Sequence, residues 1–76
     1  MRSDQKRLIA EYIELSDRIE KLSNLVDGYD DSGIAYVTTK DLLVLQLTTM
    51  KDYQIILQTR MLLEGLAEYL EGLEND

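Results

Sequence analysis

Residues 8–26 read "LIAEYIELSDRIEKLSNLV", with an apolar residue at every third or fourth position. Spacings that alternate between four and three residues align side chains on one face of a helix, and they are typical of a helix that packs along another helix. The aligned residues are Leu8, Tyr12, Leu15, Ile19, Leu22 and Val26. The pattern predicts a helix from about residue 4 to 27, begun by Ser3 or Asp4 as the cap and ended by a left-handed Gly28.

A second stretch, residues 43–61, reads "LVLQLTTMKDYQIILQTRM" and repeats the same spacing. Its aligned residues are Leu43, Leu47, Met50, Gln54, Leu57 and Met61. Because the two rows match in length, they predict an antiparallel helical hairpin in which Val26 lies near Leu43 and Leu8 lies near Met61. Gln54 is the one polar member of its row, and a buried polar side chain at such a position most often fixes the register or the oligomer state.

The connection of residues 28–37 is longer than most helix-to-helix loops. On a structural interpretation, its aromatic and apolar side chains cover the closed end of the hairpin. On a functional interpretation, the start of the second helix binds phosphate through free backbone N–H groups beside Thr38, Thr39 and Lys40. Thr38 is also the expected N-cap, paired with Asp41. Both interpretations remain open on sequence alone.

The second helix is expected to run from about residue 39 to 73 and so to extend beyond the first helix. Its last turns then lack an intrachain partner, which predicts a homo-oligomeric helical bundle joined through the C-terminal half. The expected interface residues are Ile9, Ile13, Ile56, Leu63, Leu66, Tyr69, Leu70 and Leu73. The alternative is a bend at Gly65 with a short third helix that folds back.

Composition restricts the class of protein. A chain of 76 residues forms one small domain, residues 1–76, whose own core is marginal. It contains no Cys and no His, so the usual catalytic nucleophile, general base and zinc ligands are missing. We expect no enzyme activity, no metal and no cofactor. The net charge of -7 disfavours duplex nucleic acid and anionic membranes as partners, and no segment is typical of a signal peptide or a membrane span.

A candidate ligand site follows from the polar residues that interrupt the second apolar row. In an oligomer, Arg60 and its symmetry mates are expected to line a shared pocket, because a guanidinium makes bidentate contacts with phosphate. Tyr53 offers a face for stacking, and Arg7 lies at the same end of the hairpin. The candidate ligand-binding residues are Tyr53, Arg60, Gln58, Thr38, Thr39, Lys40 and Arg7.

Residues 14–26, "ELSDRIEKLSNLV", followed by residues 42–61, "LLVLQLTTMKDYQIILQTRM", resemble a family of small helical-hairpin proteins of tailed phages related to a crAss-like phage protein. The most informative shared positions are Gln46, Tyr53 and Arg60. The other shared positions are Glu14, Leu15, Arg18, Ile19, Lys21, Leu22, Leu43, Leu47, Met50, Ile56 and Leu57. The longer loop and the leucine-rich tail depart from the family pattern.

This resemblance implies a phage or prophage accessory protein made in the bacterial cytoplasm. By analogy, several small oligomeric all-helical phage proteins hold cyclic nucleotides or cyclic ADP-ribose isomers and keep them from immune effectors. The expected function is therefore sequestration of such a signal. A protein–protein interaction module that acts on a host protein through its acidic or C-terminal apolar face is the alternative, since fold alone does not define function.

Overall fold

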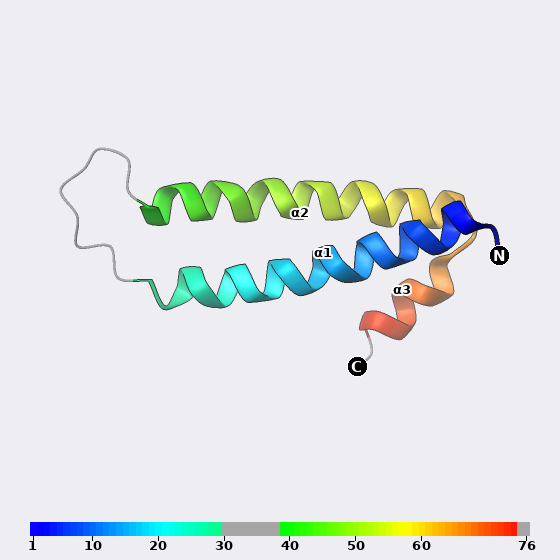
Figure 1. The fold of residues 1–76 in the computed structure, drawn as a ribbon, viewed down its shortest axis with the longest axis horizontal. Helices are drawn as coiled ribbons and strands as arrows, with labels where there is room; N and C mark the ends of the chain where they lie inside the picture. Colours follow the sequence, from blue (N-terminus) through cyan, green and yellow to red (C-terminus); the bar gives the residue numbers. More distant parts are fainter. Residues whose placement is uncertain (30–38, 75–76) are drawn as a thin grey trace.

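The computed structural model describes residues 1–29 and 39–74, with side chains described up to Leu70. These residues form three helices, α1 (Ser3–Asp27), α2 (Thr39–Leu63) and α3 (Ala67–Glu74). Helices α1 and α2 run antiparallel, and α3 turns back beside the N-terminal half of α1 (Figure 1). Thr38 and most of the predicted loop lie outside the described residues.

The helical hairpin expected from the two apolar rows is confirmed. Every member of both rows is buried or half-buried, and Leu57 and Met61 are completely covered. Residues from all three helices share the core, namely Leu8, Tyr12, Leu15, Leu57, Met61, Leu66 and Leu70. The core therefore lies at the open end of the hairpin, where α3 joins α1 and α2.

Two half-buried hydrogen bonds cross the interface between α1 and α2. The Gln54 Nε2 atom donates to Ser16 Oγ at 2.9 Å, and the Gln58 Nε2 atom donates to Tyr12 Oη at 3.0 Å. Sliding one helix along the other by one turn breaks both bonds while still allowing apolar contacts. These two bonds therefore favour the observed register over a shifted one.

Helix α2 ends in a Schellman motif at Gly65. The Gly65 N–H donates to Leu62 O at 3.1 Å, and the Leu66 N–H donates to Met61 O at 2.8 Å. Gly65 has a φ of 75°, in the left-handed region that favours glycine. Leu66 and Met61 also belong to the same core cluster, which is the apolar contact that usually accompanies this motif.

The turn at Gly65 corrects the expectation of a single helix over residues 39–73. Helices α1 and α2 have 25 residues each, so the second helix is not longer than the first. The C-terminal apolar residues Leu66 and Leu70 are buried inside the chain instead of being left uncovered. The structure instead has the bend at Gly65 and the short third helix that were expected as the alternative. Folding back lets the side chains of Leu66 and Leu70 reach the core.

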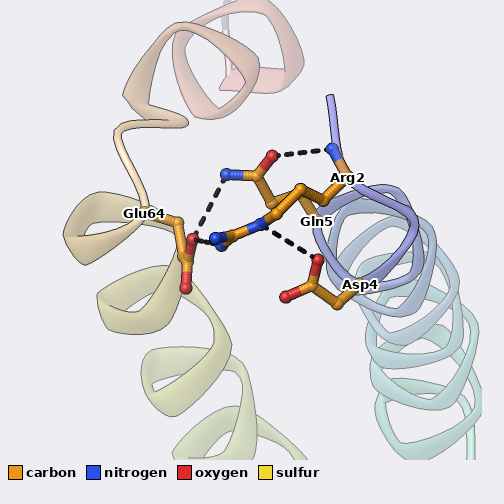
Figure 2. A network of polar contacts seen from close by, with 4 residues as sticks. All are labelled: Arg2, Asp4, Gln5 and Glu64. Carbon is orange, nitrogen blue, oxygen red and sulfur yellow. Dashed lines mark hydrogen bonds and ion pairs between the residues drawn. The ribbon is translucent and has the colours of Figure 1, made fainter.

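A polar network joins the start of α1 to the end of α2 (Figure 2). Arg2 Nη2 donates to Glu64 Oε2 at 2.6 Å, and Gln5 Nε2 donates to the same oxygen at 3.2 Å. Arg2 Nε also pairs with Asp4 Oδ1 at 3.2 Å. The charged side chains of both ion pairs are exposed, so we expect each pair to contribute only about 0.2–1 kcal/mol.

The ends of α1 differ from the sequence expectation. Arg2, rather than Ser3 or Asp4, is the N-cap residue, and its backbone N–H donates to Gln5 Oε1 at 3.0 Å. Gly28 has a φ of -94°, so the end of α1 does not use the left-handed conformation. Of these two glycines, only Gly65 therefore adopts a backbone conformation that favours glycine.

The two glycines provide a matched test of this turn. Gly65→Ala is expected to lower the free energy of unfolding by about 1–2 kcal/mol, because an L-residue is strained at positive φ. Gly28→Ala is expected to leave stability unchanged or raise it by up to about 1 kcal/mol, since its new Cβ meets Asn24 O at an ordinary 3.7 Å. Urea denaturation at equal protein concentration measures both, and equal shifts contradict the account.

Candidate functional site

Charged, polar and aromatic groups of both helices line one side of the α1–α2 interface. We call it the basic flank and define it by Arg7, Glu11, Glu14, Arg18 and Lys21 of α1 with Gln46, Tyr53 and Arg60 of α2. The α1 members are spaced four or three residues apart, so they follow one line along the helix. A hydrogen bond from Tyr53 to Glu11 and a groove shared by Arg18 and Gln46 place the two helices' members on the same side.

An open groove of about 320 Å³ lies on this flank. It is lined by Arg18, Lys21, Leu22, Leu25, Gln46 and Met50. Apolar side chains can support the face of a flat ring, while a guanidinium and an ammonium can contact phosphate oxygens. The volume falls at the lower end of the range for small-molecule sites.

Both cations of the groove have carboxylate neighbours on their own helix. Lys21 Nζ pairs with Asp17 Oδ2 at 2.9 Å, and Arg18 Nη2 lies 4.0 Å from Glu14 Oε2. The hydrogen bond from Lys21 to Asp17, with the charge of that carboxylate, raises the pKa of Lys21 above its usual value. Because these pairs are solvent-exposed and individually weak, an anionic ligand can compete for the cations at small cost.

Tyr53 lies next to the groove along α2 and donates a hydrogen bond to Glu11. This bond, followed by desolvation and the negative charge of Glu11, raises the pKa of the Tyr53 phenol, whereas the nearby positive charge of Arg60 lowers it. The phenol is therefore neutral at physiological pH, and Tyr53 is 39% exposed as a residue. Tyr53 and Arg60 extend the flank from the groove toward the open end of the hairpin.

The structure divides the ligand-binding residues expected from sequence. Tyr53, Arg60 and Arg7 belong to the basic flank, whereas Gln58 is five residues from Tyr53 and donates to Tyr12 across the helix interface. Thr39 and Lys40 begin α2, about 30 Å along the helix from Arg60. Thr38 lies outside the described residues. These candidates do not form one compact site within a single chain.

Sequence reasoning did not place Arg18, Lys21 and Gln46 in a binding site, although all three are among the positions that carry the family resemblance. The available signal was a pair of cations three residues apart on α1 that faces Gln46 in the antiparallel register. The register itself depends on interhelical contacts, so the groove could be recognised only after the two helices were aligned.

The residues expected at an oligomer interface also separate into groups. Leu66 and Leu70 are buried in the core, and Ile9 packs against it. The side chain of Leu73 lies outside the described side chains. The remaining four are exposed and stay available for contacts: Ile13, Ile56, Leu63 and Tyr69.

Within residues 1–29 and 39–74, no helix combines the length and the apolarity needed to cross a membrane. The same residues contain no group of three or more His, Cys, Asp or Glu side chains arranged to hold a metal ion.

The fold and the basic flank define a small all-helical hairpin protein with an open groove lined by two cations and apolar side chains. A family model described as Sequestin matches residues 2–63 of the chain. Because this match covers most of the sequence, the chain belongs to the Sequestin family. The matched region contains α1, α2 and the whole basic flank, and it ends before α3. No curated protein and no solved structure matches the chain.

The raised pKa of Tyr53 gives a pH-dependent prediction. The phenol has a higher pKa in the folded chain than in the unfolded chain. Its hydrogen bond therefore stabilises the fold fully below the unfolded pKa of about 10. This stabilisation is lost as the pH rises through the folded pKa. Absorbance titration of the tyrosinates should show a late component that Tyr53→Phe removes. Glu11→Gln should move this component toward pH 10, and an unchanged titration in Glu11→Gln contradicts the assigned hydrogen bond.

Proposed function

We propose that this protein is a non-enzymatic, homo-oligomeric phage or prophage protein that sequesters a nucleotide-derived immune signal in the bacterial cytoplasm. The signal is of the cyclic nucleotide or cyclic ADP-ribose type, and its capture inhibits anti-phage defence. The family name refers to sequestration, and the observation that carries the proposal is the groove that sets two cations beside an apolar floor.

The chemistry of the groove supports a nucleotide-derived ligand. Arg18 and Lys21 provide the positive charge for phosphate oxygens, while Leu22, Leu25 and Met50 provide apolar area for the face of a base. Gln46 can both donate and accept hydrogen bonds with the edge of a base or with a ribose hydroxyl. Each part of such a ligand thus meets a group of matching character within one groove.

The basic flank extends beyond the groove toward a second set of polar groups. Tyr53 is partly exposed and has a neutral hydroxyl, and Arg60 provides a further cation on the same side of α2. Because the groove is open in one chain, a second copy of the protein is proposed to complete the enclosure.

The charge of the whole chain favours a small ligand over a polymer. The net charge is -7, so a long polyanion such as duplex nucleic acid is repelled by most of the surface. A compact ligand in the groove meets mainly the local field of Arg18 and Lys21. Absence of His and Cys from the sequence supports binding without chemical conversion.

A thermal-shift panel of cyclic dinucleotides and cyclic ADP-ribose isomers tests this function. A true ligand at a hundredfold excess over its dissociation constant should stabilise the fold by about 2.7 kcal/mol. The double variant Arg18→Ala/Lys21→Ala should lose this stabilisation, because it removes the phosphate-binding charge. The melting temperature without ligand should change little, since all four side chains of the two ion pairs are exposed.

The matched control is Lys6→Ala/Lys51→Ala, which removes the same charge from positions that do not line the groove. This control should bind as the wild type does. If no member of the panel shifts the melting temperature and one stoichiometric host protein is instead captured from lysate, the protein–protein interaction module replaces the proposed function.

A further inference from the structure

The two cations of the groove have negatively charged neighbours on the same helix. Asp17 Oδ2 lies 2.9 Å from Lys21 Nζ, and Glu14 Oε2 lies 4.0 Å from Arg18 Nη2. All four side chains are more than half exposed, so both pairs are open to solvent and to a ligand. Glu14 and Asp17 are not among the side chains that line the groove. Any effect of these two carboxylates on a ligand in the groove is therefore electrostatic.

A phosphate bound by the two cations has to lie near the same carboxylates. Charge-assisted hydrogen bonds from nitrogen to oxygen are about 2.8 Å long. A phosphate oxygen bonded to Lys21 Nζ therefore lies within about 6 Å of Asp17 Oδ2, and one bonded to Arg18 Nη2 lies within about 7 Å of Glu14 Oε2. Both distances are shorter than the screening length of about 8 Å at physiological ionic strength, so the phosphate is repelled.

Helix α2 gives the groove only neutral side chains, Gln46 and Met50. Arg60, a cation of α2 on the same flank, is ten residues beyond Met50, or about 15 Å along the helix. This distance exceeds the screening length, so Arg60 does not offset Glu14 or Asp17 at the groove. The potential that a phosphate meets is thus set mainly by α1, with two cations in contact range and two carboxylates slightly farther away.

Phosphate groups differ in the charge that they bring to such a site. A phosphodiester carries one negative charge, whereas a terminal phosphate carries about 1.5–2 negative charges at pH 7. The additional charge is attracted by the cations and repelled by the carboxylates. The carboxylates therefore lower the affinity for a terminal phosphate more than they lower the affinity for a phosphodiester.

We propose that Glu14 and Asp17 are specificity-determining residues that bias the groove against terminal phosphates and toward phosphodiesters. The phosphates of a cyclic nucleotide are phosphodiesters, whereas linear nucleotides such as AMP and ATP end in a terminal phosphate. The inference rests on the proposed function and narrows its ligand class, because it gives the groove a means to hold a cyclic signal among linear nucleotides.

Cyclic AMP and 5′-AMP are matched probes, since they share base and ribose and differ in the ester state of one phosphate. NMR titration of the isotope-labelled full chain, followed at the amides of Leu22 and Gln46, measures both dissociation constants. The double variant Glu14→Gln/Asp17→Asn keeps the shape of both side chains and removes their charge. It should lower the ratio of the AMP to the cyclic AMP dissociation constant by about two- to tenfold, as expected for two exposed charge pairs.

The matched control is Asp52→Asn/Glu68→Gln. It changes the net charge by the same amount at residues of α2 and α3 that lie outside the groove and the basic flank. Its ratio of dissociation constants should stay close to that of the wild type, because the effect depends on proximity to the cations of the groove. The NMR spectrum of each variant also shows whether the fold is retained.

Two kinds of failure are distinguishable. An unchanged ratio in Glu14→Gln/Asp17→Asn, or an equal change in the control, overturns the inference and leaves the proposed function standing, since both probes still bind. Absence of binding of either probe up to about 10 mM overturns the inference together with the groove as a nucleotide site.

Discussion

Mutual burial of two apolar rows, one on α1 and one on α2, is the interaction on which the rest of this structure depends. An isolated helix of this length is marginal in water, and most of its stability in a protein comes from packing. Leu57 and Met61 of α2 lie at the best-covered part of the contact, together with Leu8 and Tyr12 of α1. The contact fixes which residues face solvent on either side, and so it positions the basic flank.

Polar contacts refine this packing without supplying most of its free energy. Gln54 and Gln58 hold the register on one side of the contact, while Tyr53 and Glu11 meet on the other. Glu64 joins the ends of α1 and α2 immediately before the chain reverses at Gly65. Folding back of α3 completes the core, while Leu45, Ile55 and Leu62 of α2 stay exposed.

The sequence predicts the hairpin because the two rows of apolar residues are long, regularly spaced and equal in length. The sequence does not show whether the second helix continues past Gly65, because Leu66 and Leu70 keep the helical spacing of the apolar residues across this glycine. The outcome depends on tertiary contacts: a left-handed glycine becomes favourable when Leu66 can join Met61 in the core. Helical spacing places Tyr53 and Arg60 on one side of α2, whereas Gln58 lies about 140° from Tyr53 around this helix. The groove at Arg18 and Gln46 requires the interhelical register, which spacing within one helix does not contain.

The central claim is that the basic flank holds a nucleotide-derived signal and returns it unaltered. The most direct measurement incubates the protein with a ligand from the panel, removes unbound ligand by gel filtration, denatures the protein and analyses the released molecule by mass spectrometry. The account predicts that the wild type releases intact ligand in a fixed ratio to protein, and that Arg18→Ala/Lys21→Ala releases none. Release of a chemically altered product, or equal retention by this variant, contradicts it.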